Sequence, residues 1–257
     1  MRRAPFVFLL AVVITAGCVS ESQTDDPQAM VDAAIEAHGG DVLEHAELSF
    51  EFRGTPFSVM RDGGRFTYKR TTTDSLRQTI EDIVDNQGAH RFVEGEEVAI
   101  DSITTRRINT DVNSVAYFAL LPIPLNDPAM QKRYLGSQII NGEAYDIVEG
   151  TFAEESGGRD YQDVFVYWFH TERHTMDYLA YSYILGADET GPNATGIRFR
   201  EAGNVRDVNG YRVQDYRNLT ADAGTDLAEM GLMFEAGELR VVSDIQLEDV
   251  RLEPITQ

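Results

Sequence analysis

The sequence predicts a mainly β, α+β fold: one strongly curved antiparallel sheet, or half-barrel, plugged by helices, in a single domain. Short apolar or alternating runs separated by turn residues fill most of the chain after residue 46, and this is the pattern of closely spaced antiparallel strands. One stretch near the middle, residues 108–128, instead has helical spacing followed by prolines. Neither half contains a linker or a change of composition that would divide the chain further.

The first residues have the pattern of a secretory leader. Arg2 and Arg3 precede an apolar stretch from Pro5 to Ile14, which is too short to span a bilayer. Thr15-Ala-Gly-Cys18 then places small residues directly before the only cysteine among the 257 residues, and this segment resembles the lipobox that lipoprotein signal peptidase recognises. We therefore predict a lipoprotein signal peptide over residues 1–17 and lipidation of Cys18, with ordinary signal cleavage or an inert leader as the alternative.

The segment after the cysteine predicts a tether. Residues 18–26 contain almost nothing that could bury apolar surface, so we expect a flexible spacer before the folded domain, residues 27–257. A single cysteine cannot form an internal disulfide. In the lipoproteins that this segment resembles, Asp directly after the lipidated cysteine retains the protein at the inner membrane. Because Val19 stands there, we expect anchoring at the outer membrane, facing the periplasm, if the host has one.

The composition is acidic and excludes one class of partner. Asp and Glu number 43 against 22 Lys and Arg, giving a net charge of −21. Nucleic-acid binding depends on clustered cations and is therefore excluded, and adhesion to anionic lipid headgroups is disfavoured. The acids are spread along the chain, which we interpret as adaptation to a salty habitat, with a functional acidic surface as the alternative.

The domain is expected to begin with a helix. Asp26-Pro27 predicts an N-cap followed by proline at the first helical position, and apolar residues recur at helical spacing as far as Ile35. Gly39-Gly40 ends the helix. His38 lies on its apolar face in the last turn, where an imidazole can pack and interact favourably with the helix dipole, so we predict a structural rather than a catalytic role.

Strand patterns come before and after the central helical stretch. About six are expected before Ile100 and about seven after Tyr134, with a helix over Ile108 to Ala119 between them. Asn141-Gly142 and Asn209-Gly210 predict tight hairpin turns. The apolar runs are Leu48–Phe52, Phe57–Val59, Phe66–Tyr68, Leu76–Val84, His90–Val93, Tyr134–Ile140, Ala144–Phe152, Tyr161–Phe169, Met176–Leu185, Gly196–Val205, Tyr211–Leu219 and Leu239–Leu247.

This order of elements resembles the LolA/LolB-like fold, a curved antiparallel sheet whose concave side is plugged by helices inserted midway through the strands. Four segments also resemble an uncharacterised bacterial lipoprotein family over residues 28–250: Ala37–Gly40, Phe118–Pro128, Met176–Tyr183, and Ile197–Arg200 together with Gly210-Tyr211. The resemblance implies a fold and carries no established activity.

Two histidines invite a metal hypothesis. His170-Thr-Glu-Arg-His174 has the four-residue histidine offset of zinc proteases. Glu172 is not adjacent to either histidine, however, and the segment joins two strand patterns. We therefore interpret it as a hairpin loop, with a metal site as the alternative. No nucleophile elbow, phosphate-binding glycine loop or nucleotide fingerprint occurs, so we predict no catalytic residue, no metal and no cofactor.

The aromatic residues are the candidate ligand-binding residues. The run from Val164 to Phe169 is apolar at every position, so both faces of this strand must be covered. One cover is the main core, and the other is either the plug helices or a bound hydrophobic ligand. Tyr167 and Trp168 are neighbours in this strand and point to opposite faces, so only one of them faces the concave side. Simple packing is the favoured interpretation and a lipid-accommodating groove the alternative; the candidates are Tyr167, Trp168, Tyr178, Tyr181 and Tyr183.

The leading functional hypothesis is a non-enzymatic, membrane-tethered binding module whose concave groove holds a lipid, an acyl chain or another hydrophobic ligand. The expected partners are a membrane, through the lipid on Cys18, and that ligand, and we expect a monomer. The alternative is an envelope interaction lipoprotein whose groove is filled by its own helices. An exported hydrolase is the least supported hypothesis, because no nucleophile, base or metal set assembles.

Overall fold

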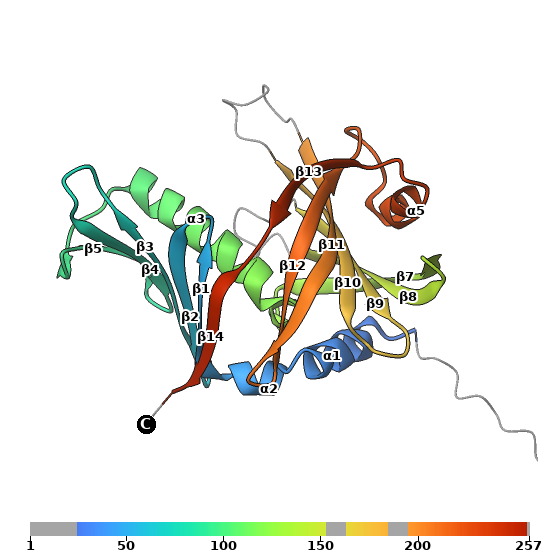
Figure 1. The fold of residues 1–257 in the computed structure, drawn as a ribbon, viewed down its shortest axis with the longest axis horizontal. Helices are drawn as coiled ribbons and strands as arrows, with labels where there is room; N and C mark the ends of the chain where they lie inside the picture. Colours follow the sequence, from blue (N-terminus) through green and yellow to red (C-terminus); the bar gives the residue numbers. More distant parts are fainter. Residues whose placement is uncertain (1–24, 153–162, 185–194, 256–257) are drawn as a thin grey trace, which may run out of the picture.

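The computed structural model describes residues 25–152, 163–184 and 195–255 (Figure 1). The predicted leader, Cys18 and most of the predicted tether lie outside the described residues. The helical elements are α1 (Pro27–Ala37), α2 (Gly40–Leu43), α3 (Ser102–Leu120), η1 (Ile123–Asn126), η3 (Leu227–Glu229) and α5 (Met230–Glu235). The strands are β1 (His45–Phe52), β2 (Thr55–Asp62), β3 (Arg65–Thr73), β4 (Thr79–Asp85), β5 (Gly88–Val93), β6 (Glu96–Glu97), β7 (Met130–Ile140), β8 (Glu143–Phe152), β9 (Val164–His170), β10 (Met176–Ile184), β11 (Thr195–Val208), β12 (Tyr211–Thr220), β13 (Arg240–Ile245) and β14 (Glu248–Pro254).

The described strands form two seven-stranded antiparallel sheets. Sheet A has the order β14-β1-β2-β3-β4-β5-β6, and sheet B has the order β13-β12-β11-β10-β9-β8-β7. The prediction of a mainly β fold with antiparallel strands around central helices is confirmed. The prediction of one continuous curved sheet is corrected to two sheets, which the chain connects through α3 in the middle and through β13 and β14 near the C-terminus.

The division between the sheets falls at the end of the last predicted strand. The run Leu239–Leu247 contains β13, which pairs with β12 in sheet B, whereas β14, which pairs with β1 in sheet A, was not predicted. At the crossing, side chains take the place of a neighbouring strand. The Leu247 N–H donates to Asp215 Oδ1 at 3.0 Å, and Arg206 Nη2 donates to the Leu247 carbonyl oxygen. An alternating pattern predicts a strand but not the sheet that it joins.

Helix α1 has the predicted start. The Asp26 side chain accepts from the Gln28 N–H at 3.0 Å and proline occupies the first turn. At its end, Gly39 adopts a φ of +76°, and a Cβ there would lie 2.0 Å from the Gly210 carbonyl oxygen. Only glycine allows this approach, so the end of α1 is fixed against the turn between β11 and β12.

The two predicted Asn-Gly hairpin turns are confirmed. Asn141 and Gly142 connect β7 to β8, and Asn209 and Gly210 connect β11 to β12. All four residues have positive φ, between 53° and 89°. Two consecutive positive values are what a type I′ turn requires, and asparagine and glycine adopt them most readily.

Helix α3 lies between the two sheets (Figure 1). Asp101 caps it by accepting from the Thr104 N–H at 2.7 Å. Ile108, Val112 and Ala116 are spaced by four residues and are buried on the side of sheet A. Although α3 is 19 residues long, no helix among the described residues is long and apolar enough to cross a membrane.

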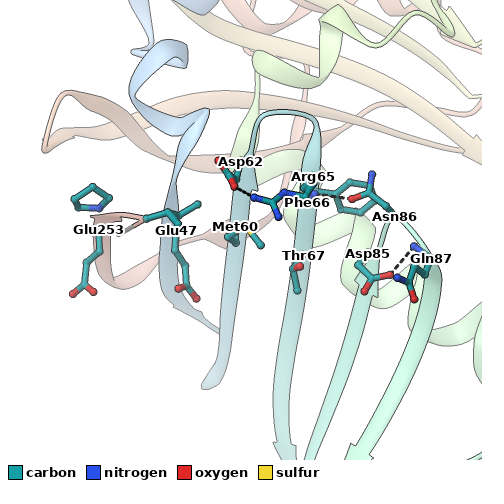
Figure 2. Close-up of a pocket in the computed structure, with 12 residues that line it drawn as sticks. Glu47, Met60, Asp62, Arg65, Phe66, Thr67, Asp85, Asn86, Gln87 and Glu253 are labelled. Atoms are coloured by element: carbon teal, nitrogen blue, oxygen red, sulfur yellow. Dashed lines mark hydrogen bonds and ion pairs between the residues drawn. The ribbon is translucent and has the colours of Figure 1, made fainter. Parts of the chain in front are cut away.

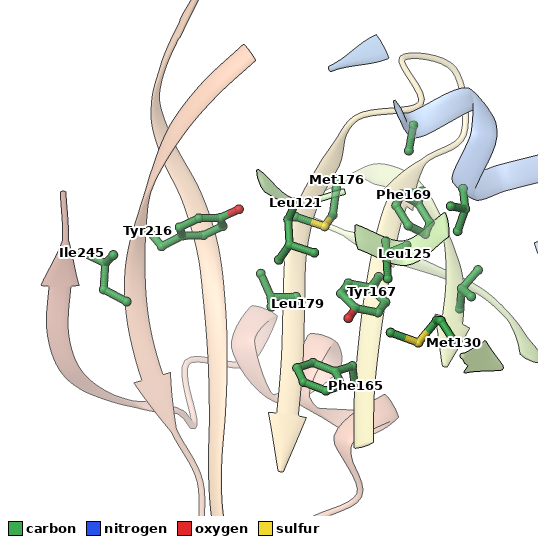
Figure 3. Close-up of a cluster of buried hydrophobic side chains, with 13 residues drawn as sticks. Leu121, Leu125, Met130, Phe165, Tyr167, Phe169, Met176, Leu179, Tyr216 and Ile245 are labelled. Atoms are coloured by element: carbon green, nitrogen blue, oxygen red, sulfur yellow. The ribbon is translucent and has the colours of Figure 1, made fainter. Parts of the chain in front are cut away.

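Both faces of sheet B are covered by the chain itself. One face carries a core built with α1, η1 and the residues that follow α3, and Phe165, Tyr167 and Leu179 lie in it (Figure 3). The other face is covered by η3 and α5, and Trp168 lies there together with Met230. The sequence analysis predicted that both faces of this sheet are covered but did not predict α5, the element that covers the second one.

Within the part of the chain that the structure describes, sheet A is covered on one face only. Leu48, Val59 and Val84 face α2 and α3 and are buried. The same face holds an ion cluster in which Asp82, only 1% exposed, accepts from Arg70 at 2.6 Å and from Arg91 at 2.6 Å. Arg70 also contacts Asp111 of α3 at 2.9 Å. This cluster ties the helix to the middle of sheet A.

Candidate functional site

A groove lies along one side of α3, between that helix, η1, α2 and the inner face of sheet A. Its volume is ≈ 630 Å³. Asn113, Tyr117 and Leu120 recur at helical spacing along the wall that α3 contributes. The apolar and aromatic part of the lining consists of Ile35, Phe66, Tyr68, Tyr117, Leu120, Ile123, Pro124 and Pro128, and the remaining lining residues are Gly40, Asp41, Glu44, Arg61, Asn113, Asn126 and Asp127.

The polar residues of this groove have an excess of negative charge. Arg61 is the one cation among the described lining residues. It pairs with Glu44 at 3.3 Å and also donates to the Tyr68 hydroxyl at 3.4 Å. Asp41 and Asp127 are the other two carboxylates. Burial raises the pKa of Tyr68, so its phenol is neutral at physiological pH. The groove therefore offers apolar surface with an acidic rim, which favours an uncharged group over an anion.

On the sheet B side, the end of α3 adds to a continuous set of aromatic rings. Tyr117 lies 5.5 Å from Phe118 and 5.5 Å from Phe165, between ring centroids. Phe118 lies 5.1 Å from Tyr181, and Tyr181 lies 5.9 Å from Tyr183. All of these except Phe165 are partly exposed. We call this set of five residues the aromatic cluster, and Tyr117 belongs both to it and to the groove.

Three of the predicted ligand-binding residues are buried by the protein's own side chains. Tyr167 faces α3, and its hydroxyl lies 2.7 Å from the Tyr117 hydroxyl; burial, with this neighbour, holds the pKa of Tyr167 well above its ordinary value. Trp168 points to the opposite face, as predicted, and donates to Gln138 Oε1 at 3.0 Å. Tyr178 lies on that same face. Of the five candidates, Tyr181 and Tyr183 are the two whose side chains reach the aromatic cluster with exposed surface.

The sequence analysis missed Arg200, which lies within the aromatic cluster. Its side chain is 7% exposed. The guanidinium carbon lies 3.6 Å from the Phe118 ring centroid, and Nη2 donates to the Tyr181 hydroxyl at 3.0 Å. Among the described residues its Nε has no hydrogen-bond acceptor and no carboxylate pairs with it. The alternation of Ile197-Arg-Phe-Arg200 was the available signal, because it places Arg200 on the face opposite the buried Phe199.

One protein family matches nearly the whole chain: its model covers residues 3–247. The chain belongs to this family of unknown function, DUF6503. No functionally curated protein matches the sequence. The membership confirms the resemblance to an uncharacterised family that the sequence analysis stated.

Solved structures show which fold this DUF6503 chain has. A LolA superfamily protein from Nitrosomonas europaea is 11% identical, with 90% of this chain and 94% of that chain covered and a TM-score of 0.51. A DUF1329 family protein from Desulfovibrio piger is 14% identical over 89% and 93% of the two chains, with a TM-score of 0.38. The lipoprotein LppX from Mycobacterium tuberculosis is 13% identical over 60% and 85%, with a TM-score of 0.26. The first of these likenesses confirms a LolA-like fold.

His38 has a structural role in the DUF6503 chain. It is completely buried, and its Nε2 accepts from the Met176 N–H at 3.1 Å. Burial, together with the charge of Arg212, lowers its pKa from 6.5 to about 3. The ring is therefore neutral at physiological pH and does not act as a cation on the helix dipole, which corrects that part of the prediction.

The segment from His170 to His174 is the predicted turn between two strands. His170 Nδ1 accepts from the N–H groups of Glu172 and Arg173, each at 3.1 Å. Its Nε2 lies 2.8 Å from Glu143 Oε2, and this hydrogen bond lowers the pKa of Glu143. Both ring nitrogens of His170 are engaged in hydrogen bonds, and the described residues contain no group of three or more side chains suited to a metal ion.

A second hollow, of ≈ 650 Å³, lies at the outer end of sheet A (Figure 2). Its polar groups shape the local turns: Arg65 pairs with Asp62, the Phe66 N–H donates to Asn86 Oδ1 at 2.9 Å, and the Gln87 N–H donates to Asp85 Oδ1 at 2.7 Å. Because these side chains serve the turns and the lining lacks a continuous apolar wall, the groove beside α3 is the better candidate site.

Proposed function

We propose that this DUF6503 protein is a non-enzymatic binding module of the cell envelope that holds a lipid or another hydrophobic molecule in its concave interior. The observation that carries the proposal is the groove of ≈ 630 Å³ that remains beside α3. Pockets for small molecules typically measure about 300–1,000 Å³ and are lined mainly by apolar side chains with a few polar groups. The volume of the groove falls in this range and eight of its fifteen described lining residues are apolar or aromatic; the LolA-like fold is compatible with the proposal.

The groove also separates this proposal from its main alternative. An interaction lipoprotein whose concave side is filled by its own helices would leave no room beside the plug. Helix α3 fills the space between the sheets along the side that carries Ile108 and Val112, but the side that carries Asn113 and Tyr117 borders open volume. Burial of apolar ligand surface there would stabilise a complex by roughly 25 cal/mol per Å².

The proposal includes an anchor. Lipid on Cys18, followed by the short polar segment before α1, would hold the domain close to a membrane, and Val19 favours the outer membrane with the domain in the periplasm. The acidic surface gives the domain no electrostatic reason to adhere to anionic headgroups. The lipid anchor would then determine the position of the protein, and the groove its binding activity.

The direct test is to identify what the native protein carries. The untagged mature protein is purified from membranes and extracted with organic solvent, and the extract is analysed by lipid mass spectrometry. We expect one class of hydrophobic molecule at close to stoichiometric amount. A protein that carries no such molecule, and that also fails to bind a fluorescent acyl-chain probe after delipidation, would contradict the proposal.

A groove-filling substitution tests the location. Asn113 is exposed on α3 and lines the groove, so Asn113→Trp fills the space without changing the core. We expect affinity for a fluorescent acyl-chain probe to fall by about tenfold or more, equivalent to roughly 1.4 kcal/mol. The control is Gln131→Trp, at an exposed position of β7 outside the groove. Equal binding by both variants would place the ligand elsewhere.

A further inference from the structure

Arg200 differs from four other arginines of the two sheets in lacking an acidic partner among the described residues. Arg70 and Arg91 pair with Asp82, Arg206 pairs with Asp215 at 3.0 Å, and Arg212 pairs with Asp177 at 3.3 Å. Arg200 is the most deeply buried arginine of the described residues, and no described carboxylate pairs with it. In a chain with 43 acidic residues, a buried guanidinium without a counter-charge is unexpected, because buried charges are normally paired.

Aromatic rings surround the Arg200 guanidinium without satisfying its donors. Its central carbon lies 3.6 Å from the Phe118 ring centroid, 5.2 Å from that of Tyr181 and 5.8 Å from that of Tyr216. Ring faces attract a cation, but they leave the Nε proton without an oxygen acceptor. The one hydrogen bond to a described residue runs to the Tyr181 hydroxyl. The arrangement is thus short of an anionic acceptor.

A second incomplete polar group lies beside this arginine. Asn218 of β12 is directly opposite Arg200 of β11 in the sheet, so both side chains share one face. Asn218 is 7% exposed, and its Oδ1 is buried without a described partner. Its Nδ2 donates to the hydroxyl of Ser243, the next residue in this row across the sheet, at 3.3 Å. If the amide turned over, Ser243 would donate to Oδ1 and Nδ2 would face an incoming oxygen.

The row of Arg200, Asn218 and Ser243 is connected to the groove through the end of α3. Tyr117 lines the groove, its ring contacts Phe118, and Phe118 lies on the guanidinium. Phe118 is only partly buried and stands in the last turn of the helix, between Tyr117 at the groove and the Arg200 guanidinium. The acidic rim of the groove would itself repel an anion, whereas Arg200 would attract one.

We propose that Arg200, assisted by Asn218, binds the anionic head group of a single-chain amphiphile, a carboxylate or a phosphate monoester, whose chain extends past Phe118 into the groove. A guanidinium fork matches two oxygens of either group. This inference rests on the proposed function, since the chain occupies the same groove. The inference specifies the class of ligand for the proposed function: an anionic amphiphile rather than a neutral lipid.

The test compares ligands that share one chain and differ in the head group. The mature chain carrying Cys18→Ser, which cannot be lipidated and needs no detergent, is titrated calorimetrically at neutral pH with dodecanoate, dodecyl phosphate and methyl dodecanoate. We expect at least one of the two anions to bind about tenfold more tightly than the ester, or more. The tighter of the two identifies the head group. Arg200→Met should remove this preference by weakening the binding of the anions more than that of the ester.

Control titrations separate the two proposals. Acetate and inorganic phosphate test whether the head group alone suffices; we expect binding weaker than that of the amphiphiles by about a hundredfold or more. If the ester binds as tightly as both anions, or if Arg200→Met keeps the preference, the head-group inference is overturned and the proposed function stands. If no dodecyl compound binds, the proposed function fails as well. Arg200→Gln repeats the test should the methionine variant fail to fold, and the comparison within the unsubstituted protein requires no change at Arg200.

Discussion

In sheet A, Arg70 and Arg91 both donate to the buried carboxylate of Asp82. In and beside sheet B, Arg200 is buried with no acidic partner among the described residues, and His38, at the end of α1, is buried without a charge. The first region contains a balanced ion cluster that ties α3 to the sheet. The second contains polar groups whose hydrogen-bonding capacity is only partly used. The difference indicates that the charges in sheet A stabilise the fold, while Arg200 is available to bind an anionic ligand.

Removing the shared acid of sheet A should have the largest effect. Asp82→Asn leaves two inward-facing guanidinium groups without their carboxylate. Loss of one partner from a buried charge cluster destabilises a protein by about 3–5 kcal/mol, so we expect a decrease of that order in the free energy of unfolding, measured with denaturant. Glu81→Gln is the matched control, because Glu81 pairs with Lys69 on the open face of the same strand and should cost less than about 1 kcal/mol. Equal effects of the two substitutions would refute the structural role of the cluster.

The Asp82 carboxylate also contributes a pH dependence of known sign. Burial alone would raise the pKa of Asp82, but the hydrogen bonds from Arg91 and Arg70 outweigh it and hold the pKa below the ordinary value of 3.8. A carboxylate with a lowered pKa stabilises the fold above its ordinary pKa, and this contribution is lost as the pH falls through the folded-state value. The loss of the stability that Asp82 contributes is therefore confined to pH values below about 4.

His38 should give the next largest effect, at higher pH. Its pKa is lowered from 6.5 to about 3, so the unfolded chain binds a proton that the folded chain rejects. Stability contributed by the neutral ring is complete above about pH 6.5 and falls progressively toward about pH 3, by roughly 3 kcal/mol between pH 7 and pH 4. His38→Gln removes the titrating group and keeps an acceptor for the Met176 N–H.

The quantity to measure for His38 is the difference between two unfolding curves. Protonation of the many surface acids alters stability in both proteins, so only the gap between unsubstituted protein and His38→Gln isolates the imidazole. We expect this gap to change in favour of the glutamine variant as the pH falls from about 7 to 4. Parallel curves over that range would show that His38 is not kept neutral by burial.

The sequence predicted those parts of the structure that depend on local chemistry. The Asp26 cap, the two Asn-Gly turns and the opposite faces of Tyr167 and Trp168 follow from backbone preferences within a few residues, and all are found. Sheet membership depends on partners distant in the chain. The run Leu239–Leu247 therefore could not reveal that the chain changes sheets at its end, and β14, which follows it, was not predicted.

The cover over Trp168 and the position of Arg200 were missed for different reasons. Asp226 caps a short helical segment, and Leu227 and Met230 have helical spacing. A pattern this short, however, cannot be distinguished from a loop in the sequence. For Arg200, the alternation indicated on which face of the strand the side chain lies, but it did not indicate whether the side chain is buried. Whether an arginine on the concave face has an acidic partner depends on residues from other strands, and this requires the three-dimensional arrangement.

The smallest expected effect decides what Arg200 is for. Arg200→Met replaces a buried, unpaired charge by an apolar side chain of similar length, a change that is often neutral when no partner charge is left behind. We expect the free energy of unfolding to change by less than about 1 kcal/mol, because the lost attraction to the rings is offset by the removal of a desolvated cation. The same substitution at Arg91 discards two hydrogen bonds to Asp82 and should cost about 2–3 kcal/mol. If Arg200→Met is instead as destabilising as Arg91→Met, the aromatic surroundings of Arg200 are a structural substitute for an acid, and the contrast between the two sheets loses its functional meaning. If it is neutral, the fold does not need the charge, and a ligand anion becomes the reason for burying it.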